Sequence, residues 1–272
     1  MINHKRPYVT YTLIVIALFV FVGVHLFGEY TIEGSIVLGA FYKPFILAGE
    51  WYRLITETFV HINILHLLMN TMALLSFGKI LEPYLGSVKF SILFFGSALC
   101  SSLYLFASDG NVLTVGMSGA LYGLMACDAY LRIRSGEFRI PQVRKAIFQT
   151  YFINLMINFM PGVSWRGHVG GFIGGLLLTM LLFKFDGCES LSKFSLVAIV
   201  LFLIGTGVFS YYNREIAEDE RFLGTDLVVL KQYESLGFKK HAEKIAINLD
   251  EIYDDGGFFL QSLKEGNYGE EN

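Results

Sequence analysis

The sequence predicts an all-α polytopic membrane protein, on three observations. Of its 272 residues, 54% are hydrophobic and 17% are charged, and the mean hydropathy of +0.52 is too high for a soluble domain of this length. Apolar windows of roughly 20 residues, long enough to cross a bilayer as a helix, recur along the chain. Basic residues gather in the short segments between these windows and acidic residues in the C-terminal tail, so nucleic acid is not an expected partner.

Seven apolar windows are expected to form membrane spans. They cover residues 9–28, 62–82, 88–107, 115–133, 144–160, 167–185 and 193–212. The first window is longer than the core of a signal peptide and lacks a small-residue cleavage site, so we interpret it as a span. We therefore expect a six-helix core over residues 1–186, an additional transmembrane helix over 187–212 and an acidic tail over 213–272.

The basic residues predict the orientation, because Lys and Arg in short loops tend to stay cytoplasmic. They precede the first span and follow the second, fourth and sixth, at Lys5, Arg6, Lys79, Lys89, Arg132, Arg134, Arg139, Arg144, Lys145, Lys184 and Lys193. The N-terminus is therefore expected in the cytoplasm of a cell whose membrane the chain crosses several times. Seven spans then place the first loop and the C-terminal tail outside. The oligomeric state is not predicted.

The tail contains an apolar-periodic stretch, 227–249, among acidic residues, which indicates one or two short amphipathic helices. A small helical appendage, a segment that docks a partner and a solvated tail all fit this pattern.

Metal and disulfide chemistry are disfavoured by the spacing of the residues that would carry them. Cys100 and Cys127 lie far apart and far from Cys188, without a CxxC pair, and are expected to pack within the membrane. Among the histidines, His61 and His66 are five residues apart, and no HExxH motif or accompanying carboxylate occurs with them. No metal and no cofactor are expected.

A serine lies in the first turns of the fourth span, in the sequence Gly116, Met117, Ser118, Gly119. Backbone N–H groups of a first helical turn lack intrahelical partners, and the positive end of the helix dipole favours a nearby oxyanion. Ser118 is therefore a candidate nucleophile. Taken alone, the motif fits close helix packing better, since small residues let membrane helices approach. The elbow of soluble hydrolases is excluded because Ala120 stands where that motif has glycine.

The sixth span places one histidine, His168, among glycines with helical spacing. These glycines form two interleaved ridges, Gly167, Gly171 and Gly175 in one and Gly170 and Gly174 in the other. If Gly119 and Gly123 of the fourth span face the first ridge, His168 and Ser118 lie at similar depth. An ionisable group in a membrane is costly and is a functional candidate, so His168 is the expected general base. The structural alternative is a histidine bonded to a backbone carbonyl.

The second span begins with two polar residues four positions apart, His66 and Asn70, which share one helix face. Both side chains donate hydrogen bonds and are suited to stabilise an oxyanion in acyl transfer. A purely structural polar network is the alternative.

Together, these motifs resemble those of the rhomboid family, known as six-helix intramembrane serine proteases that sometimes carry a seventh helix. The family's GxSG motif is met by Gly116 to Gly119, its histidine with following glycines by His168, Gly171 and Gly175, and its HxxxN element by His66 and Asn70. Trp51 and Arg53 resemble the tryptophan and arginine of the family's first loop, with Tyr52 between them, and that loop is expected to lie partly in the membrane. Tyr122 resembles the aromatic residue that packs under the histidine ring. The resemblance covers about residues 9–186, and one departure is Gly167, where the family often has alanine.

The resemblance implies a Ser118–His168 dyad that cleaves transmembrane segments of other membrane proteins within the lipid bilayer, near the outer face. The Ser118 N–H, His66 and Asn70 are implied as the oxyanion site. No acidic third member is expected, because Asp128 is ten residues beyond Ser118, about 15 Å along a helix. A noncatalytic rhomboid-like protein that binds transmembrane clients is the alternative function, and activity distinguishes the two.

Overall fold

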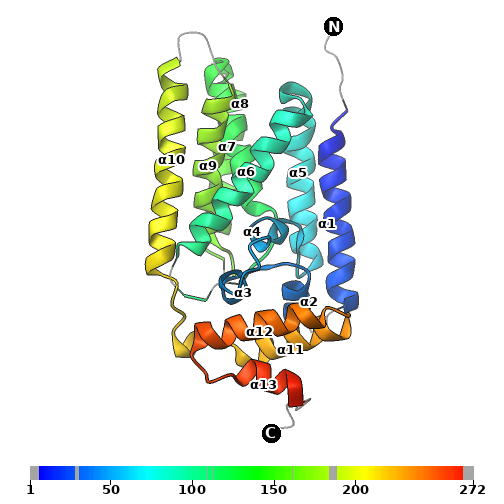
Figure 1. Cartoon of the computed structure of the whole chain (residues 1–272). Coiled ribbons are helices and arrows are strands. Elements are labelled where there is room, and N and C mark those ends of the chain that lie inside the picture. Colours follow the sequence, from blue (N-terminus) through cyan, green and yellow to red (C-terminus); the bar gives the residue numbers. More distant parts are fainter. Residues whose placement is uncertain are drawn as a thin grey trace.

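The chain is a polytopic all-α membrane protein, as predicted. The computed structural model describes residues 6–27, 31–108, 110–111, 113–160, 162–183 and 189–265, which leaves Lys5, Lys184 and Cys188 outside the described residues. Seven long helices lie side by side (Figure 1): α1 (Tyr8–Phe27), α5 (Ile64–Leu85), α6 (Ser87–Phe106), α7 (Ser118–Arg134), α8 (Pro141–Ile157), α9 (Trp165–Leu182) and α10 (Glu189–Tyr212). A short 3-10 turn, η2 (Glu137–Arg139), precedes α8.

Shorter elements occupy the first loop and the C-terminal segment. The first loop contains α2 (Thr31–Val37), β1 (Phe41–Tyr42), α3 (Lys43–Leu47), α4 (Arg53–Thr56) and the 3-10 turn η1 (Glu57–Phe59). The C-terminal segment contains η3 (Glu218–Glu220), α11 (Leu223–Ser235), α12 (Lys239–Tyr253) and α13 (Phe258–Glu265). β1 pairs antiparallel with β2 (Leu113–Thr114), with Phe41 opposite Thr114, so the first loop is tied to the segment before Ser118.

Each of the seven predicted spans coincides with one long helix. Among the described residues, four helices are long and apolar enough to cross a membrane by length and composition alone, over Tyr8–Leu26, Ile64–Leu85, Ser87–Phe106 and Ser190–Tyr212. The other three long helices differ from these in separate ways: α7 and α8 have only 17 residues each, and α9 carries Arg166 and His168 in its first turn. Most of α7 is buried among its neighbours and α9 is rich in glycine, so both face protein more than lipid. α7 also begins three residues later than predicted, because β2 and a turn at Gly116 precede it.

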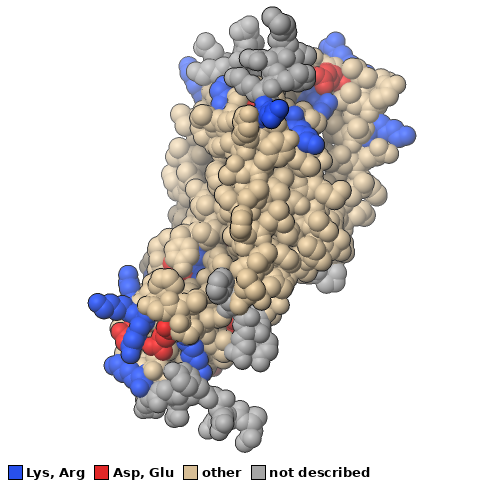
Figure 2. All heavy atoms as spheres, turned by 90° about the vertical axis from the view of Figure 1, so that its right-hand side faces the viewer, with Lys and Arg blue, Asp and Glu red and all other residues tan. Residues whose placement is uncertain are grey.

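Charged side chains gather at the two ends of the molecule. On the face shown in Figure 2, a broad band without Lys, Arg, Asp or Glu separates the two charged ends. Such a band matches the hydrocarbon core of a bilayer, where charged side chains are costly. α1 begins at one end and α11 to α13 lie at the other (Figure 1), as an odd number of spans requires.

Glycine lets α7 and α9 touch along their backbones. A Cβ atom at Gly171 would overlap the backbone of Gly119, and one at Gly175 would overlap Gly123. The predicted contact between the two glycine ridges is therefore confirmed. On its other sides α9 packs against α6 and α10. The close contact brings the first turns of α7 and α9 to the same level.

A buried carboxylate joins the first helix to the bundle. Glu82 of α5 accepts hydrogen bonds from the backbone N–H of Val9 at 2.9 Å and of Thr10 at 2.9 Å, and from the Thr10 hydroxyl at 2.8 Å. These N–H groups lie in the first turn of α1, where a helix has unpaired donors and where its dipole favours negative charge. Glu82 thus satisfies and orients the start of α1.

Arg53 fills the interior of the first loop with a fully buried guanidinium. It pairs with Glu50 and donates to the backbone oxygens of Ile36 at 2.6 Å and Ala40 at 2.8 Å. It also donates to the Tyr233 hydroxyl of α11 at 2.7 Å. A planar group with five donors can hold several acceptors at once, so Arg53 fixes the loop backbone and its contact with the C-terminal helices.

The helices α11 to α13, residues 223–265, form a unit that we term the C-terminal cap. The cap and the first loop share one apolar core: the loop contributes Ile36, Tyr42, Phe45 and Ala48, and the cap contributes Val229, Leu230, Tyr233, Ala242, Ile245, Leu249, Tyr253 and Phe259, among others. Asn248 of the cap also donates to the Ala48 oxygen at 2.7 Å. The stretch predicted as one or two amphipathic helices is therefore folded against the first loop over α11 and α12.

One acidic group lies buried within this shared core. Asp226 is completely buried and accepts hydrogen bonds from the hydroxyls of Tyr42 at 2.7 Å and Tyr253 at 2.9 Å. Removal from water raises the pKa of Asp226 from 3.8 to about 6, and the two hydroxyls only partly oppose this shift.

The raised pKa of Asp226 predicts that the cap loses stability as the pH rises. Between pH about 4 and about 6 the unfolded chain releases the Asp226 proton while the folded cap retains it, so the free energy of unfolding falls by up to about 3 kcal/mol. We expect Asp226→Asn to remove this part of the pH dependence of the thermal midpoint, measured by circular dichroism at pH 4.5 and 7.5. A midpoint whose pH dependence is the same in both proteins would contradict the prediction.

Candidate active site

Ser118 is the first residue of α7, held there by a turn that only glycine adopts without strain. Gly116 has φ +106°, and its N–H donates to the backbone oxygen of Glu57 at 2.9 Å. A Cβ at Gly116 would lie 2.6 Å from Cε1 of His66, so the turn also needs glycine for space. Backbone N–H groups in the first turn of a helix lack intrahelical partners, and Ser118 is the first residue of this turn in α7. The predicted position of Ser118 in the first turn is confirmed.

His168 lies in the first turn of α9, which Ser164 caps by accepting the Gly167 N–H at 3.4 Å. Its side chain is almost fully buried, and its Nε2 is 2.9 Å from the Ser118 hydroxyl oxygen. The Tyr122 ring, one turn after the serine, stacks on the imidazole with 4.1 Å between ring centroids and 10° between planes. These contacts place an imidazole nitrogen within hydrogen-bond reach of a serine at a helix N-terminus, the arrangement of nucleophilic acyl transfer.

His66 and Asn70 lie on α5, whose start is capped by Asn63 accepting the His66 N–H at 2.8 Å. Both side chains face Gly116 closely, so they lie beside the turn that precedes Ser118. The Asn70 amide nitrogen is 3.1 Å from Nε2 of the buried His61. Sequence reasoning considered His61 only as a metal ligand. In the structure it orients the Asn70 amide, and its position nine residues before Asn70 gave no helical spacing to indicate this.

A second amide, which sequence reasoning missed, contacts the other ring nitrogen of the imidazole. Asn158, at the end of α8, has its Oδ1 2.6 Å from Nδ1 of His168. The sequence carries a signal for it, because Asn154 and Asn158 are four apart in the otherwise apolar second half of the span, residues 151–160, and so share a helix face. Because an asparagine is not acidic, the expectation about an acidic third member did not include this pair.

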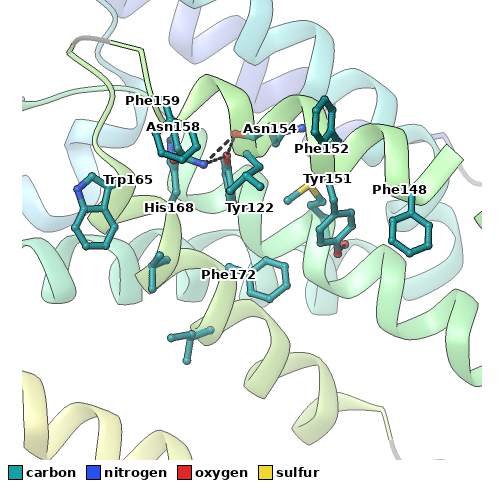
Figure 3. Close-up of a pocket in the computed structure, with 14 residues that line it drawn as sticks. Tyr122, Phe148, Tyr151, Phe152, Asn154, Asn158, Phe159, Trp165, His168 and Phe172 are labelled. Atoms are coloured by element: carbon teal, nitrogen blue, oxygen red, sulfur yellow. Dashed lines mark hydrogen bonds between the residues drawn. The ribbon is translucent and has the colours of Figure 1, made fainter. Parts of the chain in front are cut away.

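An apolar cavity of about 730 Å³ opens beside His168, between α7, α8 and α9 (Figure 3). Aromatic rings make up much of its lining, among them Phe148, Phe152, Trp165 and Phe172. α8 contributes much of this lining, and none of the described side chains of α8 is fully buried. The volume and lining suit bulky apolar side chains or lipid chains rather than polar ligands.

The remaining predicted residues stabilise the helices and the first loop around the site. Gly119, Gly171 and Gly175 provide the contact between α7 and α9, and Arg53 organises the first loop. Trp51 is half-exposed, and its ring packs edge-on against the ring of Phe106 of α6, with 5.5 Å between the ring centroids. Within the described ranges, no hydrogen bond joins Trp51 or Arg53 to Ser118 or His168, and no three His, Cys, Asp or Glu side chains come together as metal ligands.

Comparison with known proteins gives a match to one family and to several curated relatives. Residues 48–185, just over half of the chain, match the family model described as a rhomboid domain. The chain is 29% identical to rhomboid protease GluP of Bacillus subtilis over 78% of its own length, and 28% identical to the putative rhomboid protease YdcA of the same organism over 52%. It is 33% identical over 53% of its length to RHOMBOID-like protein 5 of Arabidopsis thaliana. The matches cover 41% of GluP, 71% of YdcA and 48% of the Arabidopsis protein.

Proposed function

The chain belongs to the rhomboid family, and from this membership and the geometry around Ser118 we propose that it is a serine endopeptidase acting within the membrane. The observation that carries the proposal is the 2.9 Å contact between the Ser118 hydroxyl and Nε2 of His168 at the N-terminus of α7. A buried histidine needs no serine partner for packing alone, whereas a nucleophile needs a base at this distance.

In the proposed mechanism, Ser118 attacks a peptide carbonyl while His168 takes the hydroxyl proton. His168 then gives that proton to the leaving amine, and water hydrolyses the acyl-enzyme with the same residue as base. Tyr122, stacked on the ring, limits its rotation. Negative charge on the tetrahedral oxygen would be held by the Ser118 N–H and by the side chains of His66 and Asn70.

The oxyanion role of Asn70 predicts a large loss of kcat in Asn70→Ala. Removing a single donor that acts in the transition state costs about 100-fold or more in kcat, with little change in KM. Ser76→Ala on the same helix is a matched control, since the Ser76 hydroxyl is exposed to the outside of α5 and bonds the Met72 oxygen. Initial rates in liposomes measure both parameters. Equal rates for the two variants would remove Asn70 from the oxyanion site.

The substrate class we propose is transmembrane segments of other membrane proteins. The cavity beside His168 is lined mainly by apolar side chains and suits the apolar side chains of a membrane span. A scissile segment must be unwound before its carbonyl is accessible, so helix-destabilising residues near the outer end of the substrate span favour cleavage. We also propose the cell membrane as the location, with the N-terminus in the cytoplasm and residues 213–272 outside, following a protease core at 1–186 and an added span at 187–212.

The proposal is tested by incubating the purified full chain in liposomes with a single-span substrate tagged at both ends. We expect two fragments, with mass spectrometry placing the cut within the outer third of the span, and the same rate with and without a chelator. Cleavage that a chelator abolishes would contradict the serine mechanism. Binding without cleavage of any span in a panel of single-span proteins would favour the client-binding alternative.

A further inference from the structure

Asn158 takes part in a chain of hydrogen bonds whose direction is fixed at one end. This series of hydrogen bonds runs from the backbone oxygen of Asn154 through Tyr122, Asn158 and His168 to Ser118. Figure 3 shows all of these residues except Ser118. Its anchor is the backbone oxygen of Asn154, which can only accept. The Tyr122 hydroxyl donates to this oxygen at 2.9 Å, and the Asn158 amide nitrogen donates to the same oxygen at 2.9 Å and to the Tyr122 hydroxyl at 2.8 Å.

This anchor determines the orientation of the Asn158 amide. Its nitrogen must face the Asn154 oxygen, because an amide oxygen in that place would meet a second acceptor. The amide oxygen therefore faces Nδ1 of His168, 2.6 Å away, and an oxygen without a hydrogen can only accept. Nδ1 must then carry the proton of the neutral imidazole.

A proton on Nδ1 leaves the lone pair on Nε2, the nitrogen that faces the Ser118 hydroxyl at 2.9 Å. Only in this tautomer can His168 accept the hydroxyl proton. We propose that Asn158 is a positioning residue that fixes the tautomer and orientation of His168, so that the site works as a serine, histidine and asparagine set. This inference rests on the proposed function and replaces the expectation of a dyad supported only by Tyr122.

The location of Asn158 matters because this residue directly follows the last turn of α8. No described side chain of α8 is fully buried, and the apolar cavity separates much of the helix from α7 and α9. Asn158 is half-buried at the end of this helix, with its amide turned toward the α7 and α9 side. The position of α8 therefore determines whether His168 has its partner.

Gln149, on the same helix, provides a matched control for this inference. The Gln149 side chain is exposed and does not line the cavity beside His168. Gln149→Ala should keep kcat and KM within about twofold. Asn158→Ala should lower kcat roughly 10- to 100-fold, with KM within about twofold, since one buried hydrogen bond to the general base is lost. Asn158→Asp keeps an acceptor at Nδ1 but places its second oxygen against the Asn154 backbone oxygen, so it should recover only part of the rate lost in Asn158→Ala.

Nuclear magnetic resonance of the protein with ¹⁵N-labelled histidine, in detergent, measures the tautomer without any substrate. His168→Ala identifies the signals of His168. We expect a protonated Nδ1 and an unprotonated Nε2 in the wild type and a mixture of tautomers in Asn158→Ala. A proton on Nε2 in the wild type, or equal values of kcat in Gln149→Ala and Asn158→Ala, would overturn the inference.

The two measurements separate the failure of this inference from that of the proposed function. A wild type that does not cleave but shows the Nδ1 tautomer refutes the proposed activity and leaves the positioning intact. A wild type that cleaves while Asn158→Ala cleaves equally well refutes the positioning alone. If Asn158→Ala does not fold, the tautomer of the wild type decides.

Discussion

Ser118→Ala is expected to abolish cleavage of a single-span substrate, with kcat falling about 10⁴-fold or more to the level of the uncatalysed background. The hydroxyl at 2.9 Å from Nε2 of His168 is the only group at the start of α7 that the imidazole can activate among the described residues. His168→Ala should cause a loss of similar size. Since the two residues act as a unit, the double variant should be no slower than either single variant. Initial rates in liposomes measure these losses.

Matched controls separate loss of the nucleophile from general damage to the membrane helices. Ser210→Ala on α10 removes a hydroxyl that bonds only the Thr206 oxygen, and His25→Ala on α1 removes an imidazole bonded to the Phe21 oxygen. Both variants should cleave at the wild-type rate. A serine-reactive fluorophosphonate should label the wild type and both controls but not Ser118→Ala. Wild-type cleavage by Ser118→Ala would refute the nucleophile, whatever the behaviour of the controls.

Much of the fold could be predicted because the bilayer imposes a length on each helix. Every predicted span coincides with a long helix to within a few residues, since runs of apolar residues report burial in lipid directly. The contact between the α7 and α9 glycines was also predictable, because spacing by four places small residues on one face. These features depend on local sequence.

The packing of the C-terminal cap could not be predicted, because it depends on contacts between residues far apart in the chain. Arg53 and Tyr233 are 180 positions apart, and Tyr42 and Asp226 are 184 apart. The amphipathic pattern of the tail indicated helices but carried no information on which surface they cover. The acidic composition even favoured a solvated tail, whereas Asp226 is completely buried in the shared core.

The residues of the site that belong to recognisable motifs were predicted, and those outside the motifs were missed. Ser118, His168 and Tyr122 lie together as the spacing and the family resemblance implied. Asn158 was missed because its role depends on the position of α8, which packs loosely and whose rotation the apolar pattern does not fix. His61 was missed as a partner of Asn70 because the bend at residues 62–63 before α5, not helical spacing, brings the two side chains together.

Gly171→Ala is expected to damage both folding and catalysis, although alanine is the better helix former by about 1 kcal/mol. The added Cβ overlaps the backbone oxygen and carbon of Gly119, which cannot move aside as a flexible side chain can. α7 and α9 must separate, at a cost of about 1–3 kcal/mol. Because Ser118 and His168 lie on these two helices, a displacement of about 1 Å should also lower kcat about 100-fold. Thermal midpoints in detergent and cleavage rates in liposomes measure the two effects.

Gly205→Ala on α10 is the control that assigns this loss to the helix contact rather than to the chemical change. A Cβ at Gly205 meets no atom within 4 Å, so the same substitution there gains helix propensity without a clash. We expect Gly205→Ala to keep the wild-type rate and to hold or raise the midpoint. If Gly171→Ala retained both the rate and the midpoint, the two helices would not be in backbone contact. The packing that keeps Ser118 close to His168 would then have to be provided by α6 and α8 instead.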